Sequence, residues 1–220
     1  MRKWLNQKLL KKRIELNNKN NAIGVIGFNH PELLNQRLME LAKLKGRRIY
    51  ISIHFESAGT TEKTKKTIPE SLLFLSVNNH VSITYHEKNL GLTRHATKVI
   101  SDTLNLHTNI LVIEDGIMLN KNTIYSLDFG LELMSQDFSV GSVGALSPLN
   151  LFKPFQNLNR SHRTKCLACW GWATTREKWE QDTSDLSNFD IAGSLEYPRT
   201  WNRLSHSAQS TWLGGFEKCR

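Results

Sequence analysis

The sequence has few cysteines and no long apolar run, and these two absences narrow the class of protein. Its 220 residues include three cysteines, which are too few for a disulfide-stabilised scaffold and fit reduced thiols. No apolar stretch approaches the roughly 20 residues that a membrane-spanning helix needs. The N-terminus also lacks the continuous apolar segment of a secretory signal. We therefore expect a soluble, cytoplasmic protein.

Two of the cysteines, Cys166 and Cys169, have the C-x-x-C spacing of zinc and redox sites. A four-ligand zinc site normally includes a second such pair or an H-x-x-x-H segment, and the sequence has only scattered histidines such as His162 and His206. We interpret both thiols as small buried side chains.

Acidic residues are fewer than basic ones, and the formal net charge of +9 favours an anionic partner. Nucleic acid, a phosphorylated small molecule and a membrane surface all satisfy this condition. Nucleic-acid binding would require a basic stripe interleaved with exposed aromatic residues, and only the charge supports it, so we expect no nucleic-acid partner. The hydrophobic content of 39% is sufficient for one substantial core.

Residues 1–20 form a basic leader in which residues 1–16 have the pattern of a weak amphipathic helix. The basic residues are Arg2, Lys3, Lys8, Lys11, Lys12 and Arg13, and they surround Trp4, Leu5, Leu9, Leu10 and Ile14. One interpretation is peripheral docking on the anionic inner face of a membrane. The other is a solvated leader helix, or one packed on the domain.

Strand-like and helical segments alternate after residue 21, which predicts an α/β fold with a mostly parallel central sheet and helices on both faces. The predicted strands are "AIGVIGF", "RRIYISIHF", "HVSITYHE", "TNILVIED", "SVGSVGALSP" and the segment around Trp172. The predicted helices begin near Pro31, Pro69, Leu92 and Asn122. Between the second strand and Pro69, the pattern predicts a polar loop.

Two adjacent carboxylates, Glu114 and Asp115, follow the buried strand "NILVI". Negative charge at the end of a buried strand costs free energy unless a metal, a hydrogen-bond network or an open cleft compensates it. Ligands of parallel α/β sheets bind at the carboxyl ends of the strands, and Asn29, Glu56 and Asn89 also fall there. The pair therefore indicates either a structural network or a site.

A nucleoside diphosphate fits these positions. Phe28, Asn29 and Glu56 offer a surface for base and ribose, while the segment around Asn89, Gly91 and Arg94 offers a glycine turn, helix-start amides and a cation for the phosphates. Each part alone has a simpler interpretation as a turn, a surface charge or a cap.

The segment "CWGWATTREKW" places Trp170 and Trp172 on either side of Gly171. In a strand, both indoles would face the same side and could form a stacking platform for a sugar ring. Core packing of both side chains is the alternative.

Four segments together, "FNHPELL", "NLGLTR", "LVIEDG" and "CWGWATTREKW", resemble bacterial glycosyltransferases with the GT-A fold, in the N-acetylglucosaminyltransferase I-like and family 2-like groups. The resemblance covers residues 23–179. It implies a GT-A-like (Rossmann-like) fold and transfer of a sugar from a nucleotide donor, most often a UDP-sugar, to a glycan or lipid-linked acceptor, as in capsule or lipopolysaccharide synthesis. It also implies nucleotide contacts for Phe28, Asn29, Glu56, Asn89, Gly91, Arg94 and Glu114, a manganese or magnesium ion at Asp115, and acceptor contacts for Trp170, Gly171 and Trp172.

Two departures from the family pattern bear on activity. Gly116 stands where the family has a further aspartate, the expected direct metal ligand, which puts the metal in doubt. The family's later W-D-x-x-W segment is also absent, so the catalytic carboxylate would come from another position, and we assign Asp190 and Glu217 as the candidates, with Asp182 and Glu196 as further possibilities.

We therefore expect a glycosyltransferase in which a carboxylate deprotonates the acceptor hydroxyl as the diphosphate leaves. In this interpretation residues 21–220 form one domain, with a nucleotide-sugar-binding half at 21–118 and an acceptor-side half at 119–220. One alternative is an impaired family member that binds donor or glycan without turnover, supported by Gly116 and by the missing C-terminal carboxylate motif. The other is a nucleotidyltransferase, which "GFNHPELL" disfavours because it lacks a Gly-rich basic loop.

Overall fold

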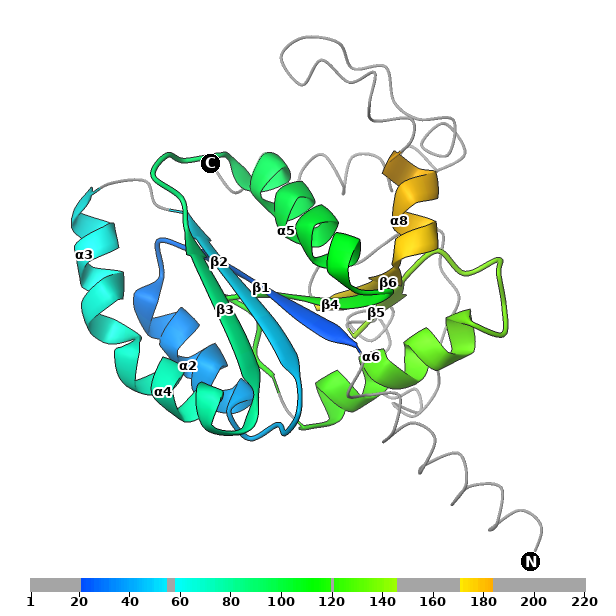
Figure 1. The fold of residues 1–220 in the computed structure, drawn as a ribbon, viewed down its shortest axis with the longest axis horizontal. Helices are drawn as coiled ribbons and strands as arrows, with labels where there is room; N and C mark the ends of the chain where they lie inside the picture. The colour runs from blue at the N-terminus through cyan, green and yellow to red at the C-terminus, as the bar shows by residue number, and fades with distance from the viewer. Residues whose placement is uncertain (1–20, 55–57, 120, 146–170, 184–220) are drawn as a thin grey trace, which may run out of the picture.

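The fold is described for residues 21–54, 58–119, 121–145 and 171–183 of a computed structural model of the chain. These residues form one sheet and the helices packed on it (Figure 1). In chain order the elements are β1 (Ala22–Phe28), α2 (Pro31–Leu41), β2 (Arg48–His54), α3 (Ala58–Thr67), α4 (Pro69–Asn78), β3 (His80–Tyr85), α5 (Leu92–Leu106), β4 (Asn109–Glu114), α6 (Lys121–Met134), β5 (Val143–Gly144), β6 (Trp172–Thr175) and α8 (Arg176–Thr183).

The sheet has the strand order β3-β2-β1-β4-β6-β5. The first four strands in this order are parallel to their neighbours, with Ile26 of β1 opposite Glu114 of β4. β6 runs antiparallel to both β4 and β5. The prediction of an α/β fold is therefore confirmed, but the sheet is mixed, because the strand that carries Trp172 runs in the opposite direction.

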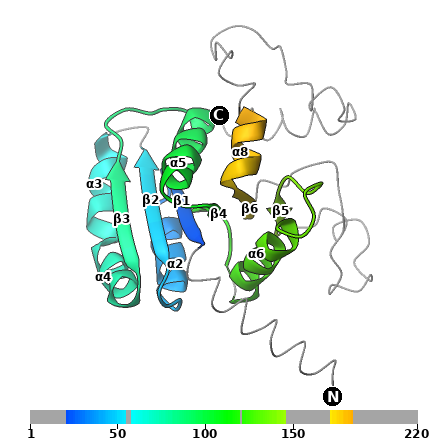
Figure 2. The ribbon, with the colours of Figure 1, turned by 45° about the vertical axis from the view of Figure 1, so that its right-hand side comes forward.

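Helices cover both faces of the sheet (Figure 2). Successive side chains of β4 alternate between these faces, as they do in any strand. Leu111 and Ile113 join the larger core beneath α2, α4 and α6, whereas Ile110 and Val112 join the smaller core beneath α5. α8 lies beside α5 on this second face, where Trp179 packs against the smaller core. This alternation explains why the strand reads as a continuous apolar run.

The predicted polar loop before Pro69 is wrong, because residues 58–67 form the helix α3. This helix has no continuous apolar stripe, so hydrophobic periodicity did not reveal it. It packs against α2 and α4. The side chain of Thr64 is buried in that contact, and an exposed ion pair joins Lys63 to Glu32 of α2. Tertiary contacts rather than periodicity therefore support this helix.

A buried polar network closes the amino edge of the sheet. Asp128 of α6 accepts hydrogen bonds from Arg47 and from the amide of Asn21, and the amide of Asn109 donates to Asn21 Oδ1 at 2.9 Å. Burial raises the pKa of Asp128, while the bonds from Arg47 lower it. Because the buried charges are paired and bonded, this edge has the character of a structural anchor.

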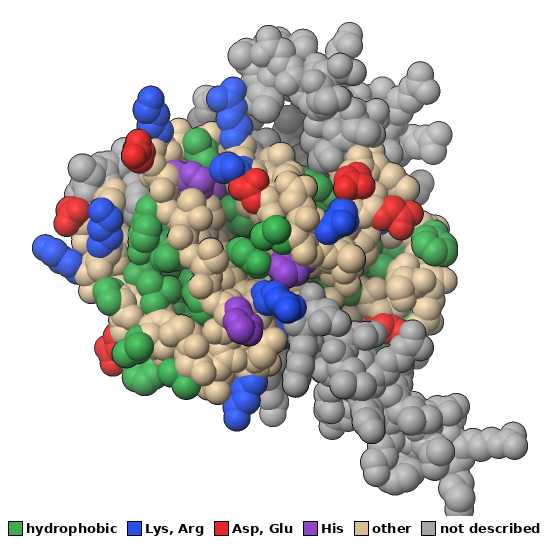
Figure 3. Space-filling model, in the orientation of Figure 1, with side chains coloured by type: hydrophobic (Ala, Val, Ile, Leu, Met, Phe, Trp, Pro, Cys, Tyr) green, Lys and Arg blue, Asp and Glu red, His purple; other side chains and the backbone are tan. Residues whose placement is uncertain are grey.

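Apolar side chains are exposed on the outer side of the sheet edge formed by β3 and the neighbouring helix α4 (Figure 3). Leu73, Phe74 and Val77 of α4 are between 47% and 71% exposed.

Within the described ranges, no helix is both long enough and apolar enough to span a membrane.

Candidate functional site

The carboxyl ends of β1 and β4 lie side by side at the point where the strand order reverses. The chain passes from β1 to β2 and β3 on one side, and then returns to β4 on the other side of β1. In open α/β sheets, such a reversal separates the loops that follow the two strands and leaves a crevice where ligands bind. Phe28, Asn29, Glu114 and Asp115 all lie at the ends of these two strands, where this rule places the crevice. The structure therefore brings together four of the residues that the sequence indicated.

The carboxylate of Asp115 links the two strand ends. Its Oδ2 accepts a hydrogen bond from the backbone N–H of Phe28 at 2.8 Å, and its own N–H donates to the carbonyl of Ile26 at 3.0 Å. The residue is 9% exposed, and burial raises the pKa of its carboxyl group, opposed by the bond from Phe28 and by the charges of His30 and Arg37. Asp115 thus belongs to a structural hydrogen-bond network as well as to the crevice.

Glu114 occupies the last position of β4, on the face of the sheet that α5 covers. Burial, followed by the neighbouring charge of Asp115, raises the pKa of Glu114 to about 7. A carboxyl group with this pKa holds a proton in part of the protein population near neutral pH. It can therefore donate a hydrogen bond to a ligand hydroxyl or accept one from it.

Arg37 of α2 holds the turn that follows these carboxylates in place, a role that was not predicted from the sequence. Its side chain is buried, and Nη1 donates to the carbonyl of Ile117 at 2.6 Å and to Oε2 of Glu40 at 2.7 Å. The same Glu40 oxygen accepts the N–H of Leu119 at 3.1 Å. We call Arg37 and Glu40, with these two backbone partners, the α2 clamp. It holds residues 117–119 against α2 through the carbonyl of Ile117 and the backbone N–H of Leu119.

The start of α5 lies at the same carboxyl edge. Gly91 precedes the helix with φ +71°, a conformation that favours glycine, and its N–H donates to Oδ1 of Asn89 at 2.8 Å. A Cβ added to Gly91 would have no heavy atom within 4 Å, so the space around it is open. The side chain of Arg94 is exposed on the first turn. The predicted Asn89, Gly91 and Arg94 therefore surround one helix start.

Beneath this helix start lies a cluster of three histidines, and the sequence interpretation missed it. The ring centroids of His54 and His95 are 4.0 Å apart, and those of His95 and His86 are 5.2 Å apart. Phe28 contacts His54 with a centroid distance of 4.5 Å. The hydroxyl of Ser52 lies 2.8 Å from Nε2 of both His86 and His95. The alternation of Ser52 and His54 along β2, both on the α5 face, is the only local signal of this cluster.

The histidine cluster is uncharged near neutral pH. Burial is the largest cause in each case, and it lowers the pKa of His95 to about 3. It also lowers the pKa of His54 and of His86. Neutral rings remove the mutual repulsion that three imidazolium groups would have at these distances.

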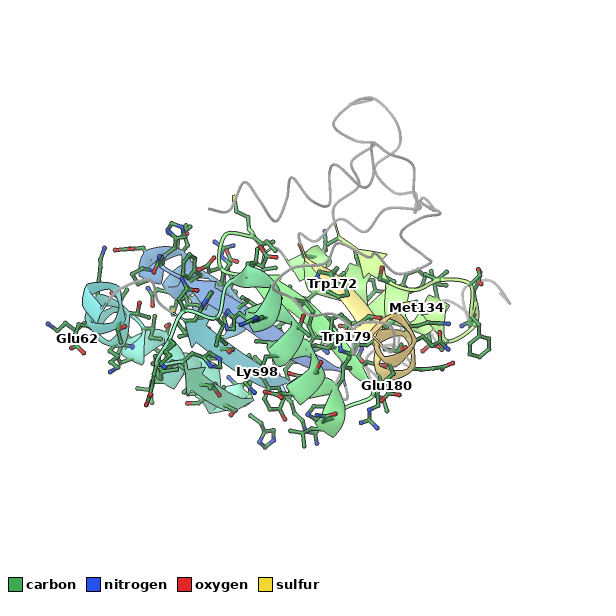
Figure 4. The ribbon with its side chains drawn as sticks, turned by 90° about the horizontal axis from the view of Figure 1, so that it is seen from above. Glu62, Lys98, Met134, Trp172, Trp179 and Glu180 are labelled. Atoms are coloured by element: carbon green, nitrogen blue, oxygen red, sulfur yellow. The ribbon has the colours of Figure 1, made fainter. Side chains whose placement is uncertain are left out.

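Trp172 is a core residue in this structure. Its side chain is 8% exposed and packs in the smaller core, with its ring centroid 6.4 Å from that of Trp179 (Figure 4). Trp179 in turn donates its indole N–H to Ser101 of α5 at 2.9 Å. This burial favours the core alternative for Trp172 over an open stacking platform. Gly171 precedes it with φ +70°, and a Cβ placed there would lie 3.8 Å from Ile117, beside the turn after Asp115.

Several predicted residues lie outside the described part of the chain. They are Glu56, Trp170, Asp182 with respect to its side chain, Asp190, Glu196, Glu217, the three cysteines and the basic leader 1–20.

The described residues do not fit a preformed site for the manganese or magnesium ion that the resemblance implies. Among them, no group of three or more His, Cys, Asp or Glu side chains is arranged to hold a metal. One oxygen of Asp115 already accepts the N–H of Phe28, and Gly116 supplies no side-chain ligand. Because Mg²⁺ and similar ions take roughly six oxygen ligands, these residues leave most positions unfilled.

Comparison with known proteins leaves this geometry as the basis for a functional argument. No protein-family model matches the chain, and no curated protein matches its sequence.

Proposed function

We propose that the protein is a glycosyltransferase that moves a sugar from a nucleotide-diphosphate-sugar donor, in the form of a UDP-sugar, to a glycan or lipid-linked acceptor. The observation that supports this most directly is the 2.8 Å bond from Phe28 N–H to Asp115, which joins the ends of β1 and β4 at the crevice. Nucleotides are among the ligands that such crevices bind in open α/β sheets.

The proposed donor occupies the carboxyl edge with its two ends in different surroundings. The nucleoside lies beside Phe28 and Asn29, and the diphosphate lies toward the start of α5. There the backbone N–H groups of the first turn and the exposed side chain of Arg94 supply positive potential. The first turn of α5 has no acidic residue to oppose an anion.

The transfer itself needs a base and stabilisation of the leaving group. The acceptor hydroxyl oxygen forms a bond to the anomeric carbon, the bond from that carbon to the diphosphate oxygen breaks, and the hydroxyl proton passes to a carboxylate. Asp190 and Glu217 are the candidates for that carboxylate that the sequence offers. No step depends on a metal ion.

Thermal unfolding with UDP, GDP and CMP tests the binding half of the proposal. A ligand that binds only the folded protein raises its melting temperature by mass action, so we expect UDP at millimolar concentration to give the largest rise. Asp115→Ala should lose most of that rise. Asp102→Ala, which removes an exposed carboxylate from α5, is the matched control and should keep it. No rise with any of the three nucleotides would remove the nucleotide-sugar assignment.

Donor hydrolysis separates an enzyme from a protein that binds without turnover, the alternative supported by Gly116 and by the missing W-D-x-x-W segment. UDP-, GDP- and CMP-sugars are incubated with the protein, with and without manganese, and the released nucleotide is measured. Release above the buffer rate supports the transferase. Thermal stabilisation by UDP with no release from any donor supports the binding protein instead.

A further inference from the structure

His54 has an uncommon position for a polar side chain. It lies at the carboxyl end of β2 and is 2% exposed, yet neither of its ring nitrogens makes a hydrogen bond of normal geometry. Within the described part of the chain, the buried polar atoms that share this condition are few. Leaving a buried donor without a partner costs free energy. A group in this state therefore has hydrogen-bonding capacity that a ligand can use.

The proton count of the histidine cluster leaves both ring nitrogens of His54, and Nδ1 of His95, without a partner. The hydroxyl of Ser52 has a single proton, so it donates to Nε2 of one of its two histidine partners and accepts an N–H from the other. This arrangement satisfies Nε2 of both His86 and His95 in their neutral forms. His54 has no such partner, and every neutral tautomer of its ring carries one N–H. A buried N–H donor is therefore left over in either tautomer.

The surroundings of His54 lead toward the start of α5. The side chain of Asn89 is close enough to act on His54 as a hydrogen-bond partner that raises its pKa, and Oδ1 of Asn89 also accepts the N–H of Gly91 at 2.8 Å. Asn89 is exposed, and the space next to Gly91 is open. A ligand oxygen that takes the place of the Asn89 side chain at the helix start would therefore meet the imidazole.

The electrostatics around His54 suit an anion. Among the described residues, the groups that face it are Phe28 from β1, Ser52 from its own strand, His86 and Asn89 from the segment after β3, and His95 from α5, and none of these is an acid. The charged residues Lys98 and Asp102, further along α5, act on His86 with opposite signs. Helix-start amides attract negative charge, and no carboxylate in this part of the cluster opposes them.

We propose that His54 is a ligand-binding residue that donates its ring N–H to a phosphate oxygen of an anionic ligand held at the start of α5, beside Asn89 and Gly91. This assignment rests on the proposed function for the identity of the ligand as a nucleoside diphosphate. It adds a residue of β2 to a site otherwise formed by β1, β4 and α5. A phosphate next to the imidazole also favours its protonated form, so binding should take up protons.

Calorimetric titration with UDP and with inorganic pyrophosphate, at about pH 6.5, tests this assignment. His54→Ala removes the donor and should weaken the binding of both ligands by about tenfold to a hundredfold, the range for a hydrogen bond to a charged group. His54→Gln keeps an N–H donor and should recover part of this affinity. It is also the variant on which the test depends if the alanine protein does not fold. The control is His107→Gln, because His107 bonds to Tyr50 at 2.7 Å, away from the start of α5.

Proton uptake provides a readout that a purely structural histidine would not change. The titrations are repeated in two buffers with different enthalpies of ionisation, and the difference in heat gives the number of protons bound. The wild-type protein and His107→Gln should take up a fraction of a proton that His54→Gln does not.

Three results decide between the two proposals. If both ligands bind but the His54 variants keep wild-type affinity and proton uptake, the assignment of His54 is wrong and the proposed function stands. If pyrophosphate binding depends on His54 but UDP binds no more tightly than pyrophosphate, the phosphate site stands and the nucleotide assignment fails. If the wild-type protein binds neither ligand, both proposals are wrong.

Discussion

Replacing Glu114 by glutamine should make the protein more stable at alkaline pH, because it removes a carboxyl group that the fold keeps from ionising. The pKa of Glu114 in the folded protein is about 7, compared with an ordinary value of 4.5. A difference of about 2.5 units corresponds to about 3.4 kcal/mol, since each unit is worth about 1.4 kcal/mol. Glutamine has nearly the same shape and stays neutral at every pH.

The direction of the effect follows from where the proton is held more tightly. Between about pH 4.5 and pH 7, the folded protein keeps a proton on Glu114 that the unfolded chain releases. The stability that this group contributes is therefore fully present below about pH 4.5 and is lost as the pH rises through about 7. Relative to wild type, Glu114→Gln should gain about 3 kcal/mol between about pH 4.5 and pH 8.

Urea unfolding at a series of pH values measures this gain as the difference between the variant and the wild-type protein at each pH. The difference is needed because the histidine cluster acts in the opposite direction. The lowered pKa of His95, about 3, removes stability as the pH falls below about 6.5 in both proteins. Glu87→Gln, at an exposed carboxylate between β3 and α5, is the control for loss of charge. A variant-minus-wild-type difference that stays constant across this pH range would refute the reasoning.

Three further substitutions have defined outcomes. Trp172→Ala should lower the free energy of unfolding by about 3–5 kcal/mol, measured by urea unfolding, because it empties a core position beside Trp179; a loss below about 1 kcal/mol would place the indole outside the core. Arg37→Lys should weaken UDP binding, because one ammonium group cannot reproduce the α2 clamp, but it should preserve more stability than Arg37→Ala. If parallel titrations give equal UDP affinity for the wild type and both variants, the clamp does not contribute to UDP binding. Gly116→Asp should fold normally, since the φ of Gly116 is not left-handed and an added Cβ meets no atom within 4 Å. This variant should also tighten manganese-dependent UDP binding. Strong, saturable manganese dependence already present in the wild-type protein would show that another residue serves as the ligand.

The parallel strands could be predicted from the sequence because their signals are local. "AIGVIGF" and "NILVIE" are apolar runs between polar breaks, and the structure places them as β1 and β4. The carboxylates after β4 could be located at the carboxyl edge for the same reason, because the end of a buried strand fixes where the next two side chains lie. Periodicity therefore predicted which residues reach the edge.

Contacts between distant segments could not be predicted in this way. Arg37 bonds to a carbonyl that lies 80 positions further along the chain, and His54 meets His95 only because α5 packs over β2. The burial of Trp172 could not be predicted from a local pattern either. Alternation assigns its indole to a face of β6 but does not say that α5 and α8 cover that face. The sequence indicated the positions along each strand, and the packing of helices determined which of them are buried.

The α2 clamp gives the two sides of the crevice different mechanical character. On one side, the turn after β4 is tied to β1 through Asp115 and to α2 through Arg37 and Glu40, so it can move only together with those elements. On the other side, Gly91 and Asn89 are exposed and are joined by a short-range bond. Adjustment to ligands of different size should therefore occur at the start of α5, while the carboxylate side serves as a fixed reference against which a ligand is positioned.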